Sequence, residues 1–401
     1  MTTAGWPYDD LDVAALFAGG WRPTPFHEVI VKVHQRCNLA CSYCYVYHHT
    51  DQTWRDRPAV MPDEVFTAVV QRLDRHVRTH DLRQVRVVLH GGEPMLVGAA
   101  RLGGLAAQLR AALPSDCRLR IGMQTNGVLL TESALRELHR HDIAVAVSVD
   151  GVAETHDRHR ITRAGRGTFA AVSRALELLA RPEFREGYGG LLCTVVPDTD
   201  PVECYTRLRA FEPPAMDFLL PHANWGAQPD RPSGGQHDYG AWLIGAFDAW
   251  YADPDPVPVR LFESVVDLVL GGASRSEQVG LSPAALIVVE SDGAIEQIDA
   301  LKSAYPGACA TGLHVTRDDF DAALVHPGVV ARQIGLAALG DDCAACPVRR
   351  ICGGGHYAHR YRPGAGFRNP SVYCADLMLF IEHVRGRVVA DTRALVGAAI
   401  A

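Results

Sequence analysis

Residues 28–44 read EVIVKVHQRCNLACSYC, an apolar segment that leads directly into a loop with three cysteines. The β-branched run at Val29–Val33 predicts a buried β-strand. Cys37, Cys41 and Cys44 follow with the spacing CxxxCxxC. A loop that leaves a strand end can bring three thiolates around one [4Fe–4S] cluster, and three ligands leave the fourth iron open to a further molecule. A zinc knuckle or three buried thiols are the alternatives.

The first half of the chain repeats a pattern of strand and helix. Amphipathic segments such as Glu64–His80 and Ser133–His139 separate the apolar runs. Such alternation predicts βαβ units around a parallel sheet. Six units over residues 25–225 predict an α/β protein with a partial (β/α)6 TIM-like barrel, whose chemistry belongs at the C-terminal strand ends. The six expected strands are Val29–Val33, Val85–His90, Leu119–Gln124, Ile143–Val149, Gly190–Val196 and Asp217–Leu220.

The remaining chain predicts four further parts. Residues 1–24 are expected to form an arm that packs on the barrel. The Gly- and Pro-rich stretch Gly226–Asp238 opens a region of linker and bridging helices that ends at residue 285. Residues 286–385 predict a C-terminal α+β domain of short strands and turns, and residues 386–401 a tail.

Composition excludes some classes of function. The net charge is −7 and no basic run appears, so a nucleic-acid partner is not expected. The N-terminus lacks the features of a signal peptide and no long apolar run follows, which predicts a cytoplasmic protein with no membrane partner. Eleven cysteines in such a protein indicate metal or redox chemistry rather than disulfides.

Further polar motifs stand at or just after the expected strand ends. They are HGGEP at His90–Pro94, QTNG at Gln124–Gly127, SVDG at Ser148–Gly151 and HDRHR at His156–Arg160. Gly91 and Gly92 allow the backbone to approach a ligand closely. Taken alone, HGGEP is equally consistent with an ordinary turn.

A second group of four cysteines lies near the C-terminus, at Cys343, Cys346, Cys352 and Cys374. Four thiolates close a cluster, so this group is expected to transfer electrons rather than bind a substrate. Zinc on the same thiolates is the alternative. Among the other cysteines, Cys193 is expected in the core, Cys309 lies in a Gly/Ala turn as a candidate for a further auxiliary ligand, and Cys117 and Cys204 have no expected role.

The cysteine loop, with Tyr43 before its last cysteine, resembles the radical SAM superfamily. The resemblance implies a [4Fe–4S] cluster on Cys37, Cys41 and Cys44 that binds S-adenosylmethionine, and an external electron donor of the flavodoxin or ferredoxin type. It implies that Arg160, rather than the competing Arg158, pairs with this cofactor. Leu219–Pro221 would line the adenine pocket or form a core strand. The other implied cofactor contacts are Tyr43, Gly91, Gly92, Glu93, Pro94, Thr125, Asn126, Ser148 and Asp150.

The second cysteine group resembles part of a SPASM domain, the C-terminal iron–sulfur extension of many peptide-modifying radical SAM enzymes. A full SPASM domain has seven cysteines and two auxiliary clusters. Here the turn Ser291–Gly293 resembles its hairpin, but Ile298 and His356 stand where further cysteines are expected. The resemblance therefore implies one auxiliary [4Fe–4S] cluster.

Longer phrases resemble the FxsB-type radical SAM/SPASM maturases over about residues 25–384. The phrases are Val31–Leu39, Tyr45–Tyr47, Asp51-Gln52, Trp54-Arg55, Val85–Pro94, Cys352–Tyr361 and Asn369–Cys374. The resemblance implies modification of a ribosomally made precursor peptide by a cyclophane cross-link between an aromatic ring and a nearby side-chain Cβ. The alternatives are a radical SAM peptide epimerase or dehydrogenase, and a non-catalytic zinc or iron–sulfur protein.

Such a cross-link needs a base near the aromatic ring. Asp299 is preferred, because it follows the hairpin expected to face the barrel opening. The other candidates are Glu290, Asp292, Glu296, His222 and His356. No separate leader-binding domain is visible, so the barrel, the bridging region and the C-terminal domain are expected to bind the peptide together.

Overall fold

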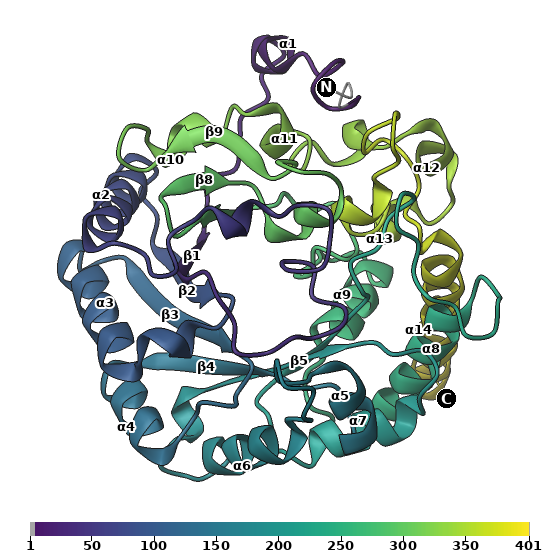
Figure 1. Cartoon of the computed structure of the whole chain (residues 1–401). Coiled ribbons are helices and arrows are strands. Elements are labelled where there is room, and N and C mark those ends of the chain that lie inside the picture. Colours follow the sequence, from purple (N-terminus) through teal and green to yellow (C-terminus); the bar gives the residue numbers. More distant parts are fainter. Residues whose placement is uncertain (1–4, 401) are drawn as a thin grey trace.

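A nine-stranded sheet, curved into an open ring with helices around its outside, organises the computed structural model, which describes residues 5–400 (Figure 1). Its strand order is β6-β5-β4-β3-β2-β1-β7-β8-β9. The strands from β6 to β7 in this order run parallel, whereas β8 and β9 are antiparallel. The strands are β1 (Glu28–His34), β2 (Gln84–Gly91), β3 (Arg118–Thr125), β4 (Ile143–Ser148), β5 (Tyr188–Thr194), β6 (Met216–Leu219), β7 (Leu286–Val289), β8 (Ala294–Glu296) and β9 (Ala310–His314).

The six expected barrel strands are all present, each within two residues of its expected limits. In β1, residues such as Val29 and Val31 are fully buried and pair with Val87 and Leu89 of β2. Burial on both faces of a parallel sheet favours such near-continuous β-branched runs. The prediction of an α/β partial barrel is confirmed.

Helices between the strands cover the outer face of the ring (Figure 1). The expected segments Glu64–His80 and Ser133–His139 are helices α2 and α4. None of the helices within residues 5–400 combines the length and hydropathy needed to span a bilayer. The longer helices are α2 (Asp63–Thr79), α3 (Ala99–Ala112), α4 (Glu132–Arg140), α5 (Ala153–His159), α6 (Phe169–Leu179), α7 (Pro201–Arg209), α8 (Asp238–Tyr251), α9 (Arg260–Val269) and α14 (Cys374–Ile400). The shorter ones are α1 (Val13–Ala18), α10 (Phe320–Ala323), α11 (Pro327–Val330), α12 (Asp341–Ala345) and α13 (Arg349–Cys352).

The C-terminal region is not separate from the barrel sheet. Strand β7 lies parallel to β1, with Leu286 opposite Glu28 and Val289 opposite Val31. The expected hairpin joins β7 to β8, and its Gly293 has a φ of +97°, a backbone conformation that glycine adopts without strain. The hairpin therefore places the residues after it beside the C-terminal end of β1.

Two expectations at the chain ends are wrong. The arm packs on the C-terminal region instead of the barrel: the Trp6 carbonyl accepts a hydrogen bond from the Phe367 amide (3.2 Å), and both side chains belong to one buried cluster. The predicted boundary at residue 385 falls inside α14, which runs on to Ile400. Residues 1–4 of the predicted arm and Ala401 of the predicted tail lie outside the described residues.

Candidate functional site

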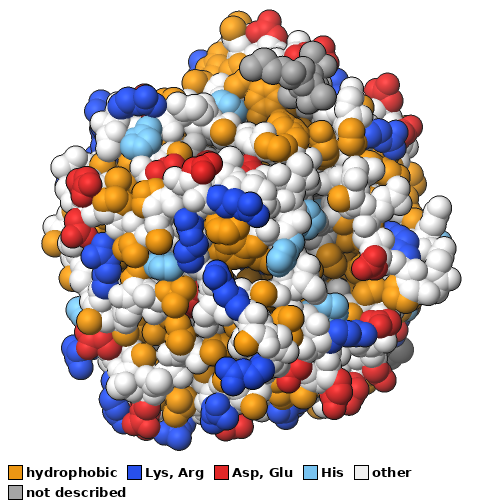
Figure 2. All heavy atoms as spheres, viewed as in Figure 1, with side chains coloured by type: hydrophobic (Ala, Val, Ile, Leu, Met, Phe, Trp, Pro, Cys, Tyr) orange, Lys and Arg blue, Asp and Glu red, His pale blue; other side chains and the backbone are white. Residues whose placement is uncertain are grey.

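Cys37, Cys41 and Cys44 lie in the loop after β1 and line a cavity of about 220 Å³ at the C-terminal ends of the barrel strands. The loop runs across the open centre of the ring (Figure 1). Figure 2 shows a hollow on this face, with hydrophobic side chains inside it and basic side chains around its rim. The three thiols therefore meet where a parallel barrel places its chemistry.

The cysteine environment fits a metal cluster. Burial raises the pKa of the Cys37 thiol to about 12 and that of Cys41 to about 11, and it also raises the pKa of Cys44. The Leu39 amide donates to Cys37 Sγ (3.4 Å). Such thiols ionise when a metal ion coordinates them. The three-thiol donor set matches a [4Fe–4S] cluster with one open iron.

The HGGEP backbone packs directly under the cysteine loop. A Cβ on Gly91 would lie 2.0 Å from the carbonyl oxygen of His34, and a Cβ on Gly92 would lie 2.5 Å from that of Arg36. Neither distance is tolerable for a methyl group. Both glycines line the cavity, and they are required there because backbone meets backbone.

Glu93, just after β2, links the end of β2 to the end of β3 next to the cavity. It is buried, and its carboxylate accepts hydrogen bonds from the Thr125 hydroxyl (2.6 Å), the Asn126 amide (2.8 Å) and the Met95 amide (2.9 Å). Neither Glu93 nor Pro94 lines the cavity, whereas Thr125 and Asn126 do. A contact between Glu93 and the cofactor remains a prediction.

Arg160 reaches the cavity through a buried ion pair. Its Nε lies 2.9 Å from Asp150 Oδ2, and its guanidinium lies over the Tyr43 ring, 5.5 Å from the centroid. The Tyr43 hydroxyl donates to the same carboxylate. Arg158 instead pairs at the surface with Asp198 (2.7 Å). Arg160 is thus the arginine placed for a ligand, and Asp150, which does not line this cavity, positions it.

The rest of the wall comes from β4 and the end of β6. The Ser148 hydroxyl accepts a hydrogen bond from the Gln124 side chain (2.9 Å), and both residues line the cavity. Leu219–Pro221 line it as well. Leu219 also ends β6 and Leu220 belongs to the main core cluster, so both expectations for Leu219–Pro221 hold, while a contact with adenine stays a prediction.

A second cavity of about 810 Å³ adjoins the first. Its wall includes Asp299, on the segment that follows the β7–β8 hairpin. Among the other base candidates only His222 and His356 also line it. The residues shared by the two cavities are Tyr45, His90, Leu219, Leu220 and His222. A molecule in the larger cavity can therefore reach one held beside the three cysteines.

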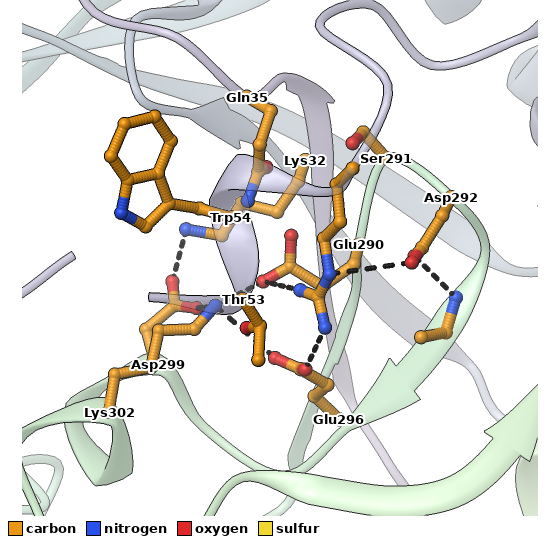
Figure 3. A network of polar contacts seen from close by, with 12 residues as sticks. Lys32, Gln35, Thr53, Trp54, Glu290, Ser291, Asp292, Glu296, Asp299 and Lys302 are labelled. Carbon is orange, nitrogen blue, oxygen red and sulfur yellow. Dashed lines mark hydrogen bonds and ion pairs between the residues drawn. The ribbon is translucent and has the colours of Figure 1, made fainter. Parts of the chain in front are cut away.

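The chain has only two lysines, and both contact Asp299. Lys32 pairs with Asp299 Oδ2 and donates to His90 Nδ1 (2.9 Å). Figure 3 shows both lysines beside the carboxylate. Burial raises the pKa of Asp299, but the two ammonium groups outweigh that effect and hold it well below its usual range. Oδ1 accepts no hydrogen bond from the described residues, although Lys302 Nζ lies 3.4 Å away.

The neighbouring acids are engaged elsewhere. Arg57 pairs with Glu290 (2.8 Å), Glu296 (2.5 Å) and Asp292 (3.4 Å), and Lys302 also contacts Glu290 and Glu296. The three acids do not line the larger cavity, although Figure 3 shows them in the same network as Asp299, which shares Lys302 with Glu290 and Glu296. Asp299 is therefore the one acid among the sequence-predicted base candidates that lines the larger cavity.

The four C-terminal cysteines converge on one cavity of about 190 Å³. Its wall includes Val348, Met378 and the four residues Cys343, Cys346, Cys352 and Cys374. Four thiols in an apolar pocket fit a closed cluster or a zinc ion. Cys309 and Ile298 lie in another buried cluster, and Cys193 lies 3.8 Å from Cys204 (Sγ to Sγ) in the barrel core.

Sequence reasoning missed Lys32, Lys302 and His359 as site residues. Lys32 carried a signal, since a lysine inside an apolar strand needs a buried partner. The partners lie about 270 residues away in the sequence, so only the pairing of β1 with β7 reveals them.

Comparison with known proteins agrees with this geometry. Residues 31–203 match the Radical SAM superfamily. The chain is 27% identical to a cysteine-type anaerobic sulfatase-maturating enzyme of Clostridium perfringens, across 69% of this chain and 74% of that protein. It is 25% identical to a serine-type anaerobic sulfatase-maturating enzyme of Klebsiella aerogenes, across 84% of this chain and 81% of that protein.

A solved structure has the same fold. The native enzyme anSMEcpe with bound AdoMet and Cp18Cys peptide aligns with a TM-score of 0.77 and 23% identity, over 92% of this chain and 99% of that one. The match to the superfamily confirms the expected cofactors, S-adenosylmethionine and the [4Fe–4S] cluster that binds it. Residues 31–203 are thus a radical SAM domain, and the chain is an enzyme related to the anaerobic sulfatase-maturating enzymes.

Proposed function

We propose that this enzyme modifies a ribosomally made precursor peptide by a cyclophane cross-link, a carbon–carbon bond between an aromatic ring and a nearby side-chain Cβ. The observation that carries the proposal is Asp299, an ionised carboxylate on the wall of a cavity that adjoins the three cysteines. The longer phrases shared with FxsB-type maturases support the type of bond. The solved structure of the same fold, which holds a peptide with AdoMet, supports a peptide substrate.

The residues that would hold the cofactors follow from the two groups of cysteines. Cys37, Cys41 and Cys44 would hold the cluster that binds S-adenosylmethionine, with Arg160 in reach of that ligand. The four C-terminal cysteines would hold one auxiliary [4Fe–4S] cluster. When bound, these groups supply a 5′-deoxyadenosyl radical that takes a hydrogen atom from a peptide Cβ, and an acceptor for one electron.

The chain itself positions the peptide and removes a proton. A bond between the Cβ and a ring carbon leaves that ring carbon with one hydrogen too many, and aromaticity returns when a proton and one electron leave. Asp299 takes the proton. A carboxylate with a low pKa suffices, because the ring cation that remains once the electron has left is a strong acid. Cavity walls that hold ring and Cβ together supply the proximity the bond needs.

Asp299→Asn tests this role. The test uses anaerobic holoenzyme, S-adenosylmethionine and synthetic candidate precursor peptides that contain aromatic residues. We expect 5′-deoxyadenosine to form while cross-linked peptide is lost, because the amide cannot accept the proton. Formation of 5′-deoxyadenosine also shows that the variant has folded. Asp292→Asn, in the hairpin turn that precedes Asp299 and paired with Arg57, is the matched control and should keep full activity. Full cross-linking by Asp299→Asn removes the role.

Oxidation of a serine or cysteine side chain is the second candidate, and the sulfatase-maturating relatives favour it. Cross-linking and serine oxidation both remove two hydrogens from the peptide. Fragmentation separates the two, since a cross-link suppresses cleavage inside the bridged block while an oxidised side chain leaves every peptide bond cleavable. A new aldehyde that reacts with a hydrazide reagent would identify the second candidate and exclude the first.

A further inference from the structure

Three histidines from two distant segments meet at the wall of the larger cavity. His222 lies three residues after β6. His356 precedes the short helix Tyr357–Arg360, and His359 lies within it. Each histidine offers one ring nitrogen, and these atoms all lie within 4.8 Å of one another. The ring centroids are 5.0 to 5.7 Å apart, and all three side chains line the cavity.

Several of their nitrogens have no partner. His359 is 1% exposed, and neither of its ring nitrogens forms a hydrogen bond with any described residue. The same holds for His222 Nδ1. His356 Nδ1 accepts from the Ala358 amide (3.3 Å), which leaves Nε2 as its free ligand atom. Buried polar atoms without partners are costly, so their convergence on one point indicates a missing partner.

The charge state of the rings suits a cation. Burial lowers the pKa of His222 and of His356 to about 3, and that of His359 well below its usual value. All three rings are therefore neutral near pH 7, and a neutral imidazole has a lone pair to donate. Two carboxylates on the same cavity wall add favourable negative charge: Asp299, and Glu277, whose Oε2 lies 4.0 Å from His356 Nε2. The guanidinium groups of Arg332 and Arg360 act in the opposite direction and contribute to the low pKa values of His356 and His359.

We propose that His222, His356 and His359 bind one divalent transition-metal ion of the zinc or ferrous class. Imidazole nitrogen is a preferred ligand for both ions. Three histidines form the ligand set of sites that keep a further position open to water or substrate. The site needs no sulfur, so it is separate from both groups of cysteines, and it does not depend on the reaction proposed above.

A second group of possible ligand atoms, elsewhere in the chain, serves as a comparison for the three histidines. His76, His80 and Asp321 also lie within 4.8 Å of one another. There His76 already uses both nitrogens: Nε2 accepts from the Phe26 amide (3.1 Å), and Nδ1 lies 2.5 Å from Asp321. With its partners inside the protein, this group is not expected to bind a metal ion.

The experiment measures zinc on the holoenzyme. Protein with its iron–sulfur clusters assembled is treated with a chelator, desalted and titrated with Zn²⁺, and zinc, iron and sulfide are counted per chain. We expect one zinc ion per chain in the wild type and in His76→Gln. His359→Gln should weaken zinc binding by at least about 100-fold, because losing a ligand exceeds the 10–100-fold effect of losing a ligand's outer partner. Iron and sulfide should stay unchanged in both variants.

Cobalt identifies the ligand atoms in the same samples. In the difference spectrum between cobalt-loaded and metal-free holoenzyme, which removes the absorption of the iron–sulfur clusters, Co²⁺ on the histidines should give d–d bands and no new sulfur-to-cobalt charge-transfer band. His222→Gln, on the half-exposed side of the cluster, replaces His359→Gln if the latter misfolds. Three results would overturn the proposal: no zinc on the wild type, equal zinc binding by the wild type and the histidine variants, or a charge-transfer band that places the ion on cysteines.

Discussion

Gly92 lets the cysteine loop lie against the end of β2, because a glycine has no methyl group to hold the two backbones apart. The carbonyl of Arg36 and the hydroxyl of Tyr47 occupy the space that a Cβ would need. Replacing this residue therefore tests the packing of the loop without touching a cysteine.

Gly92→Ala should destabilise the protein by about 1–3 kcal/mol, the usual cost of overpacking, and should reduce the iron that the protein retains. Thermal unfolding and iron analysis check both effects. Gly104→Ala is the matched control, since a Cβ there meets nothing within 4 Å. Because Gly104 lies inside α3, the alanine should raise stability by up to about 1 kcal/mol. Equal behaviour of the two variants would contradict the close packing.

His90 gives the site a defined proton arrangement and a pH dependence. Lys32 donates to Nδ1, so the proton of the neutral ring sits on Nε2. Burial and the neighbouring ammonium of Lys32 lower the pKa of His90 to about 3. Between pH 3 and the ordinary value of about 6.5, the unfolded chain binds a proton that the folded protein refuses.

Stability should consequently fall as the pH drops below about 6.5, and His90 should not affect it above that value. Between about pH 7.5 and about pH 5, the free energy of unfolding of His90→Gln should fall by about 1–2 kcal/mol less than that of the wild type. Chemical denaturation of both proteins at the two pH values measures the difference. If the free energies of unfolding of the wild type and His90→Gln changed equally with pH, His90 would be protonated in the folded state.

The residues that surround the three cysteines could be predicted from the sequence, because each polar motif stands at or just after the C-terminal end of a strand. Cys37, Cys41, Cys44, Gly91 and Arg160 line the smaller cavity and Asp299 lines the larger one, while their roles stay predictions. The role of Glu93 as a link between strand ends could not be predicted, since its partners Thr125 and Asn126 belong to the next strand. The histidine cluster was hidden for the same reason, because His222 and His359 lie 137 positions apart in the sequence.

At the scale of elements, the six strands of the barrel could be predicted from the sequence, whereas the pairing of β7 with β1 could not. Long apolar runs identify β1 to β5 without any knowledge of their neighbours. Strand β7 has only four residues, and its pairing with β1 spans more than 250 residues. Helix α14 was cut short because its amphipathic pattern is weak, although it packs firmly against α8 and α9.

Phe380 fixes α14 to the barrel. It is fully buried, with its ring 6.0 Å from Phe247 of α8 and 5.8 Å from Phe262 of α9. Phe380→Ala should cost about 3–5 kcal/mol of stability, as for other large buried aromatic residues. Leu395→Ala on the same helix, at a side chain 73% exposed, should change stability by less than about 0.5 kcal/mol. Thermal unfolding compares the two, and a small effect of Phe380→Ala would mean that α14 is only loosely attached.

At the scale of the whole molecule, the chain has two separate cavities lined by cysteines, one beside the barrel strands and one in the C-terminal region. Anaerobically purified protein should contain about eight irons, as expected for two cubane clusters. Replacing Cys37, Cys41 and Cys44 with alanine should reduce this to about four irons. About four irons and one zinc in the wild type, with the zinc unaffected by the histidine variants, would make the C-terminal site structural.

The two lysines that flank Asp299 also decide how the folded chain meets proteases and amine reagents. Both side chains are 1% exposed, so a protease specific for lysine finds no site on the native surface within the described residues. Such a protease can cut only after β1, which carries Lys32, or the short helix Asp299–Ser303, which carries Lys302, has opened. Its cleavage rate therefore reports the opening of the segments that carry Lys32 and Lys302 beside Asp299. A bound peptide should slow cleavage by the lysine-specific protease. Cleavage by trypsin, which also cuts at the many surface arginines, should slow far less.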